Sequence, residues 1–171
     1  MTRQILAAFA LMIGICVTPV TMAADPPPRL KDAIVGNWTL VSLRATRPDG
    51  GVVMPYGPHA AGMMTFGKNG RFAIILINPD LPKYASNDRE KPAPAEALAV
   101  ATGSTATFGS YTVDGAARTV ALHVDASSYP NDNGASQIKT VKSISDDGLV
   151  LDTAASTNGG TVVELTLKRA D

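Results

Sequence analysis

At residues 161–169 the chain reads Thr-Val-Val-Glu-Leu-Thr-Leu-Lys-Arg, an alternation of apolar and polar side chains. Successive side chains of an extended strand point to opposite faces, so Val163, Leu165 and Leu167 share one face and the polar residues between them share the other. A related alternation occurs over residues 118–126. Patterns of period two indicate strands that bury one face, and they predict a β protein.

Similar short runs of Val, Ile, Leu, Thr and aromatic residues follow one another along the chain, separated by turn-forming clusters. The clusters are Asp49-Gly50-Gly51, Lys68-Asn69-Gly70, Asp114-Gly115, Ser145-Asp146-Asp147-Gly148 and Thr157-Asn158-Gly159-Gly160. Asn-Gly and Asp-Gly steps favour the positive φ angles of hairpin turns. We therefore expect strands near 35–45, 51–55, 61–67, 71–77, 106–113, 118–126, 136–144 and 149–154, with 161–169 as a ninth segment. The run at 51–55 has the weakest pattern.

Sequential strands joined by tight turns, without alternating helices, predict an all-β antiparallel meander. Closing the meander into an up-and-down barrel of about eight strands would remove exposed sheet edges. Such a barrel is wide enough to be filled with side chains or to hold one small ligand. An open sheet or a sandwich is the alternative. One short helix is expected at Pro94–Ala101, covering the outer side of 73–77, which is apolar on both faces.

The first 23 residues have the layout of a secretory signal peptide. Arg3 supplies the positive charge, Ile5–Val17 forms the apolar core, and Thr21–Ala23 supplies small residues before a cleavage point. The core is shorter than the roughly 20 residues that span a bilayer. We therefore predict an exported protein, periplasmic or secreted, with no integral membrane segment after processing.

The predicted mature chain consists of a Pro-rich leader, residues 24–33, and a single domain, residues 34–171. Cys16, the only cysteine, lies in the signal segment, so the mature chain has no disulfide and no thiolate. The whole sequence has 15 Lys and Arg against 15 Asp and Glu. Because the charges balance and form no basic cluster, we expect no nucleic-acid partner.

The segment Val35-Gly36-Asn37-Trp38 contains a Gly-x-Trp pattern of the kind found in the first strand of lipocalins. Further short motifs follow it in order: Leu40-Val41-Ser42, Asp49-Gly50, Pro55-Tyr56-Gly57-Pro58, Gly62, Asn69-Gly70-Arg71-Phe72, Asn78-Pro79-Asp80, Tyr84-Ala85-Ser86, Phe108-Gly109-Ser110-Tyr111, His123-Val124 and Tyr129-Pro130-Asn131. Over nearly the whole mature chain this set resembles the lipocalin-like domain family of small, mostly uncharacterised proteins. The resemblance implies a lipocalin-like β-barrel and no defined activity.

By analogy with lipocalins, Gly36 and Trp38 are structural, and a basic residue of the last strand, Lys168 or Arg169, packs across Trp38. The chain also departs from the family pattern. Members often carry paired histidines in the sixth strand, an aromatic residue after the Pro-Asn step and a Trp in the last strand. The corresponding residues here are Leu122 before His123, Asp132 after Asn131, and Thr166.

Candidate ligand-binding residues are the aromatic side chains near the expected strands, together with one histidine: Tyr56, Phe72, Tyr84, Phe108, Tyr111, His123 and Tyr129. Core packing is the simpler interpretation for the aromatic ones. His123 shares a strand face opposite the apolar Val120, Leu122 and Val124. If that apolar face lines the interior, His123 points outward. If the barrel holds a polar pocket, His123 is a candidate acid or base near neutral pH.

The sequence predicts no cofactor and no metal site, because it has no phosphate-binding glycine motif, no metal-ligand spacing and no nucleophile motif. Gln137 and Lys139 alternate on one strand face, which we expect to be exposed to solvent. The charged, Pro-rich stretch 78–94 is a candidate lid or a simple cap over one end of the barrel.

The leading hypothesis is an exported barrel that binds a small, largely apolar molecule. Two alternatives stay open: a cofactor-independent isomerase or cyclase that uses His123, and a filled barrel that acts as a structural module. The oligomeric state is open.

Overall fold

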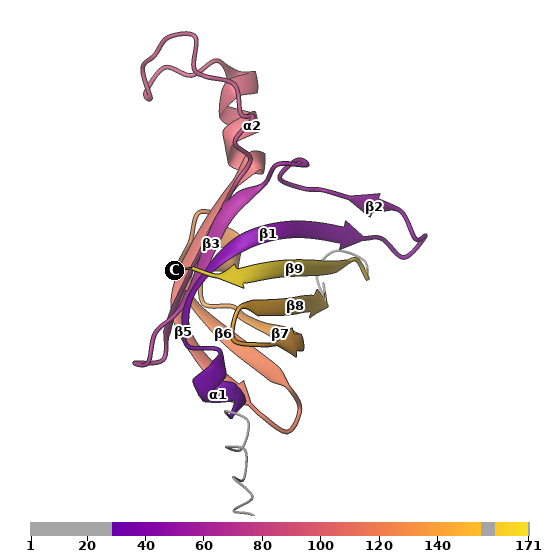
Figure 1. The fold of residues 1–171 in the computed structure, drawn as a ribbon. Coiled ribbons are helices and arrows are strands. Elements are labelled where there is room, and N and C mark those ends of the chain that lie inside the picture. Colours follow the sequence, from indigo (N-terminus) through magenta and orange to yellow (C-terminus); the bar gives the residue numbers. More distant parts are fainter. Residues whose placement is uncertain (1–28, 155–159, 171) are drawn as a thin grey trace, which may run out of the picture.

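Eight strands form a closed antiparallel ring. The computed structural model describes residues 29–154 and 160–170, and Figure 1 shows its ribbon. The strands are β1 (Gly36–Thr46), β2 (Val52–Val53), β3 (Ala61–Phe66), β4 (Arg71–Ile77), β5 (Ser104–Asp114), β6 (Thr119–Ser127), β7 (Ser136–Ile144), β8 (Gly148–Ala154) and β9 (Val162–Arg169). Consecutive strands pair from β3 to β9, and β1 pairs with both β3 and β9, which closes the ring. The up-and-down barrel is therefore confirmed, and the open sheet and the sandwich are excluded.

The weakest predicted strand contributes little to this barrel. Of the segment 51–55, only the two residues of β2 pair, and they pair with the end of β1 outside the ring. Pro55 lacks a backbone N–H and so cannot extend the ladder. The ninth predicted segment, 161–169, supplies the eighth barrel strand, β9.

The last residues of the predicted Pro-rich leader, residues 24–33, have a regular structure. Leu30–Ala33 forms a single helical turn, α1. Leu30 packs against the core, and the following Ile34 is completely buried in it. The predicted signal peptide, residues 1–23, lies outside the described residues.

Trp38 and Arg169 hold α1 against one end of the barrel. The buried indole Nε1 of Trp38 donates a hydrogen bond to the carbonyl of Ile34 at 2.9 Å. The guanidinium of Arg169 lies over the same ring, 4.1 Å from its centroid. It also donates to the carbonyl oxygens of Ala33 and Val35 at 2.9 and 3.0 Å. These contacts join the first and last strands of the ring to α1.

The contact predicted across Trp38 for Lys168 or Arg169 is therefore made by Arg169. Gly36 is required beside it for two reasons. Its φ of +138° is a conformation that residues with a side chain rarely adopt, and a Cβ atom would stand 2.6 Å from an Arg169 guanidinium nitrogen.

The helix α2 (Pro94–Gly103) forms where the sequence predicts a helix. The two oxygens of the Glu96 carboxylate accept hydrogen bonds from two backbone amides, those of Ala85 in the preceding loop and of Ala93 at the start of the helix, at 2.9 and 2.8 Å. These two hydrogen bonds, the Ala85 bond first, hold the pKa of Glu96 below its ordinary value. The carboxylate thus ties the preceding loop to the helix.

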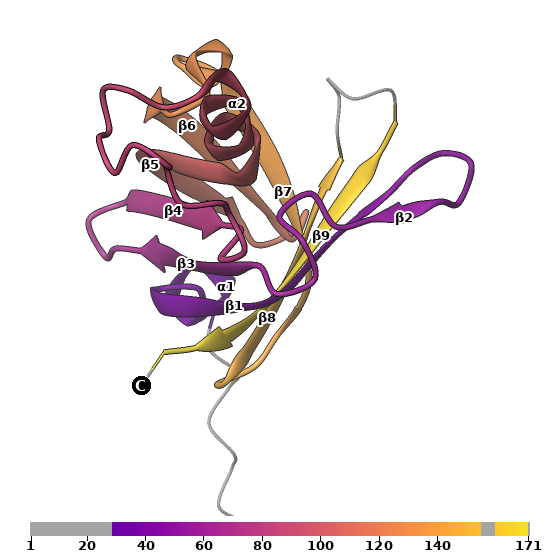
Figure 2. The ribbon, with the colours of Figure 1, turned by 90° about the horizontal axis from the view of Figure 1, so that it is seen from above.

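The position of α2 differs from the prediction. The two views place it beyond the ends of β4 and β5, projecting from the barrel rather than lying on its outer face (Figures 1 and 2). Because β5 begins at Ser104, directly after the helix, α2 continues the line of that strand. The Asn78 amide donates to the Gly103 carbonyl at 2.8 Å and fixes this junction. The prediction that the helix covers residues 73–77 is wrong.

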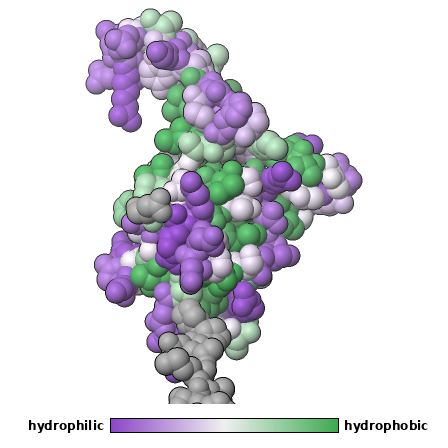
Figure 3. Space-filling view, in the orientation of Figure 1, coloured by the Kyte–Doolittle hydropathy of each residue, from purple (hydrophilic) through white to green (hydrophobic). Residues whose placement is uncertain are grey.

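An apolar surface therefore remains on the outside of β3, β4 and β5. The outward side chains of Met63, Ile75, Ile77 and Phe108 are 40–49% exposed, and we call them the outer apolar face. In the space-filling view, hydrophobic residues reach the surface of the barrel below the projecting segment, whose tip is mostly hydrophilic (Figure 3).

Candidate functional site

The interior of the barrel is lined by the inward-facing side chains of all eight ring strands. Most of them are buried Leu, Ile, Val, Met and Phe residues, as in β6, where Val120, Leu122 and Val124 point inward. Two polar residues, Thr107 and Lys139, are buried as well. The barrel core is therefore apolar with a few polar positions, which is also the usual composition of the residues that line a small-molecule site.

Lys139 projects into this interior from β7. It lies between Val120 of β6 and Thr153 of β8 in the strand ladder, and it is 8% exposed. Its Nζ donates a hydrogen bond of 2.7 Å to the Thr153 hydroxyl. Within residues 29–154 and 160–170 this is its single hydrogen bond, and no carboxylate forms an ion pair with it. An ammonium group has three N–H donors, so Lys139 is incompletely partnered within that part of the chain.

Burial lowers the pKa of Lys139 from its ordinary 10.5 to about 8, because an apolar surrounding disfavours the charged form. The negative charge of Asp132 acts in the opposite direction. Asp132 belongs to a short 3₁₀ turn, η1 (Pro130–Asp132), between β6 and β7. Its Oδ2 accepts a hydrogen bond from Gln137 Nε2 at 3.3 Å. With a pKa near 8, about nine in ten Lys139 side chains are cationic at pH 7.

Two pairs of hydroxyl groups lie along β5, and the two members of each pair form a hydrogen bond with each other. The hydroxyl oxygens of Thr107 and Ser127 are 2.9 Å apart. The Tyr56 hydroxyl, from the connection between β2 and β3, is 2.8 Å from that of Thr105. The Tyr56 pair ties this connection to the barrel wall. Lys139 differs from both pairs because it brings a charge.

The structure brings three of the predicted ligand-binding aromatics to the core. Phe72 is buried among the inward-facing side chains. Tyr111 is partly buried, meets Phe66 edge-on with ring centroids 5.0 Å apart, and donates its hydroxyl to the Gly67 carbonyl at 2.9 Å. Burial raises the pKa of Tyr111. Tyr56 packs against the core from its connecting loop.

The other four predicted residues do not reach the interior. Tyr84 lies in the loop before α2, and Phe108 and Tyr129 are 49% and 56% exposed. His123 is exposed on the outer face of β6, where its Nδ1 is 2.8 Å from the Ser136 hydroxyl. Its neighbours Leu122 and Val124 point into the barrel, so His123, which lies between them on the strand, must point outward. The acid–base role considered for His123 inside the barrel is therefore wrong.

Lys139 itself corrects a prediction, because the face that it shares with Gln137 was expected to meet solvent. The sequence of β7 misleads here, since Ile138 looks like the buried residue but is 52% exposed. The useful signal lies in the partner strand. Once Val120 and Leu122 are assigned to the interior, their pairing with Lys139 and Gln137 turns those residues inward too.

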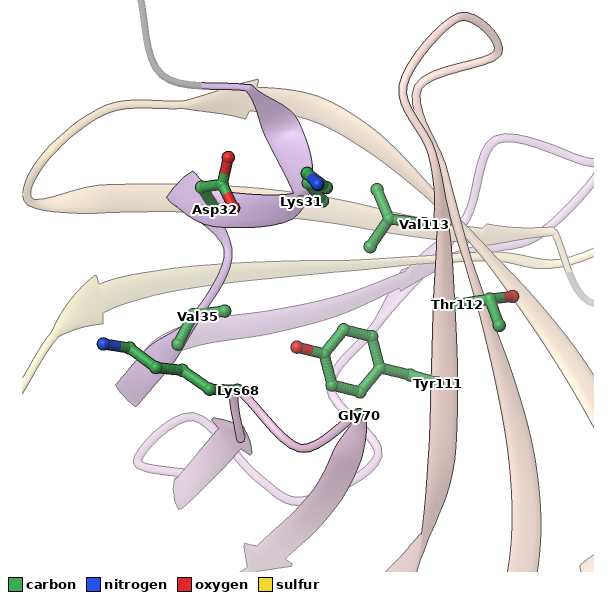
Figure 4. Close-up of a pocket in the computed structure, with 8 residues that line it drawn as sticks. All are labelled: Lys31, Asp32, Val35, Lys68, Gly70, Tyr111, Thr112 and Val113. Carbon is green, nitrogen blue, oxygen red and sulfur yellow. The ribbon is translucent and has the colours of Figure 1, made fainter.

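A depression of about 860 Å³ lies next to α1, between the β3–β4 turn and the end of β5. Figure 4 shows the Tyr111 ring at its centre, with Lys68 and Val35 on one side and Thr112 and Val113 on the other. The charged side chains that line it are Lys31, Asp32 and Lys68, and all three are exposed. Because exposed charges remain hydrated, we place the candidate site at Lys139 in the barrel interior rather than here.

Within residues 29–154 and 160–170, no group of three or more His, Cys, Asp or Glu is arranged to hold a metal ion. Neither α1 nor α2 has the length and apolar character needed to cross a membrane.

Comparison with known proteins places the chain in a family. The family model described as "Lipocalin-like domain" matches residues 35–170. No curated protein matches. Similar solved structures include a lipocalin-like protein from Bacteroides uniformis, with 17% identity and a TM-score of 0.43, covering 81% of this chain and 99% of that one.

Two ligand complexes are also among the similar structures. Bovine odorant-binding protein, solved with a selenium-containing odorant, has 13% identity and a TM-score of 0.43, covering 88% of this chain and 78% of that one. The amine-binding protein of Rhodnius prolixus, solved with tryptamine, has 9% identity and a TM-score of 0.42, covering 90% and 70%. Because the family model spans nearly all of the barrel, the chain belongs to the lipocalin-like domain family.

Proposed function

We propose that the protein binds a small, largely apolar molecule inside its barrel. The observation that carries the proposal is the mixed interior, an apolar lining into which Lys139 projects with one hydrogen bond among the described residues. Membership of the lipocalin-like domain family and the closed ring of eight strands support it, because a barrel of this size can hold one small ligand.

A core that served packing alone would gain nothing from this lysine. Burying a charge lowers stability unless the charge is paired, and Leu or Met would fill the same position without that cost. Polar groups placed in an apolar pocket instead orient a ligand and select among ligands. The interior therefore has the composition of a binding site, and its apolar majority matches a largely apolar ligand.

The test uses N-phenyl-1-naphthylamine, an uncharged apolar dye whose fluorescence rises in apolar surroundings. We expect saturable binding of one dye per protein. Ala45 is inward and buried, whereas Ala121 points outward, so each is replaced by Phe. Ala45→Phe occupies interior space and should weaken dye binding at least tenfold, while Ala121→Phe should leave it unchanged. Circular dichroism verifies that both variants are folded.

A third variant separates interior binding from adsorption to the surface. Phe108→Ser removes a side chain of the outer apolar face and should leave dye binding unchanged. Binding that survives Ala45→Phe and disappears in Phe108→Ser would contradict the proposal.

The outer apolar face favours a second candidate function, a filled barrel that acts as a structural module. Met63, Ile75, Ile77 and Phe108 lie on one side of the sheet and are partly exposed, and exposed apolar patches often mark interaction surfaces. The two candidates differ in the dye experiment. A structural module binds no dye in its interior, so complete absence of saturable binding would favour it.

We also propose that the protein is exported to the periplasm or beyond the cell. The support is the sequence of residues 1–23, with Arg3, the apolar run and the small residues before Ala24. Mass spectrometry of the protein purified from fractionated cells tests this. A mature chain that starts near Ala24 in the periplasm or medium is expected, and a full-length cytoplasmic chain would refute it.

A further inference from the structure

We infer that the molecule held in the barrel carries a single carboxylate, which pairs with the Nζ of Lys139 and with the hydroxyl of Thr153. This inference rests on the proposed binding function and specifies the chemistry of the ligand. Its basis is a buried cation that, within residues 29–154 and 160–170, has no anionic partner in contact.

Hydrogen-bond geometry at Lys139 leaves donors available to an anion. Nζ uses one N–H for the Thr153 hydroxyl oxygen at 2.7 Å. That oxygen accepts the bond, so the hydroxyl hydrogen of Thr153 is free to donate in turn. An incoming carboxylate, which only accepts, can receive one bond from the ammonium and one from the hydroxyl. Charge-assisted bonds of this kind are the strongest hydrogen bonds that proteins form with ligands.

The charges around the site favour a monoanion over other ligand charges. A cationic ligand would be repelled by Lys139, and an uncharged one would leave its charge uncompensated. A second negative charge would lack a partner and would also meet the field of Asp132, whose carboxylate already acts on Lys139. Asp132 is not a contact partner of Lys139: its Oδ2 accepts a hydrogen bond from Gln137 at 3.3 Å, and no ion pair joins Asp132 to Lys139 in the described part of the chain.

The neighbours of Lys139 define the rest of the ligand. In the ladder, Val120 and Val141 are buried apolar residues close to it, and Leu151 precedes Thr153 on the inner face of β8. The ligand body in contact with these side chains must be apolar. The chemical class is thus an aliphatic or aromatic monocarboxylic acid with one charged end.

The test compares dodecanoate with dodecan-1-ol, two chains of equal length that differ in the head group. Each displaces N-phenyl-1-naphthylamine from the wild type, from Lys139→Met and from Lys168→Met at neutral pH. Lys168 is an exposed lysine on the outer side of β9 and is the matched control. The alcohol reports on the apolar pocket alone, so it also shows that each variant is folded and competent.

We expect the wild type and Lys168→Met to bind the acid at least tenfold more tightly than the alcohol. Lys139→Met should lose that preference through weaker acid binding, while its alcohol affinity stays the same or increases. If Lys139→Met keeps the wild-type ratio of acid to alcohol affinity, the inference is overturned and the binding function stands. If neither compound nor the dye binds the wild type, both proposals are overturned.

Discussion

Replacing Lys139 with Met should stabilise the protein at neutral pH. In the folded state the pKa of Lys139 is about 8, against an ordinary value of 10.5, so burial of the charge lowers stability by roughly 3 kcal/mol at pH 7. The exchange removes that penalty, and Met has a similar length and no charge. It also removes the hydrogen bond to Thr153, which is worth about 1 kcal/mol. The expected net gain is about 2 kcal/mol in the free energy of unfolding.

The gain depends on pH, and its direction follows from proton binding. Between pH 8 and 10.5 the unfolded chain binds more protons at this lysine than the folded one, so the stability of the wild type rises with pH. Below pH 8 the lysine is protonated in both states and the penalty is constant. The advantage of Lys139→Met should therefore be largest at neutral pH and should vanish as the pH approaches the ordinary pKa.

Urea denaturation of both proteins at neutral pH and near pH 10 measures this difference. For a chain of this size a gain of about 2 kcal/mol also corresponds to a rise in Tm of roughly 4–8 °C. The reasoning would be refuted if Lys139→Met were no more stable than the wild type at neutral pH. It would also be refuted if the difference between the two proteins were the same at both pH values.

Three other predictions concern stability. Arg169→Met should lower the free energy of unfolding by roughly 2–4 kcal/mol, because it removes charge-assisted hydrogen bonds and the stacking of the guanidinium on the Trp38 ring. Lys168 is an exposed neighbour, so Lys168→Met should change the free energy of unfolding by less than about 0.5 kcal/mol in the same urea experiment. Gly36→Ala should lower it by roughly 1–3 kcal/mol through backbone strain, and an unchanged melting temperature would contradict the assigned φ of +138°. Glu96→Gln should speed hydrogen exchange at the Ala93 amide, because the carboxylate that accepts its hydrogen bond is removed. The exchange rate of the wild type should rise to that of the variant only when the pH falls below 4.5 and through the lowered pKa of Glu96, where the carboxylate becomes protonated. Equal exchange rates of the two proteins at neutral pH would show that the carboxylate does not protect the Ala93 amide.

The bounds of several strands could be predicted closely from the sequence. The segments 71–77 and 136–144 have the predicted bounds in the structure, and β6 points its apolar residues inward as expected. These predictions succeed because local alternation and turn residues determine where a strand begins and ends. The helical turn Leu30–Ala33 was missed because four residues carry no periodicity, and its stability comes from contacts with the distant Arg169.

The site residues were harder to predict because they depend on strand pairing. His123 and Phe108 both follow the rule that inward and outward positions alternate, but only the register with neighbouring strands says which face is the inner one. Lys139 shows the limit of residue type as a guide. A lysine is normally assigned to the surface, and only its pairing with Val120 places it among buried side chains.

The pairing of β1 with β9 has a consequence for how the chain folds. It brings Trp38 opposite Arg169, so the contact that closes the ring joins the two ends of the domain. Bringing such distant segments together carries a large entropic penalty before any contact forms, and topologies of this kind fold slowly. Until the last strand docks, both β1 and β8 present unpaired edges. A circular permutant that joins the ends near residues 29 and 170 and opens the chain in the loop before α2 would turn the β9–β1 contact into a local hairpin. It would also make β4 and β5 the pair that joins the chain ends, so the last step of ring closure should move from β9–β1 to β4–β5.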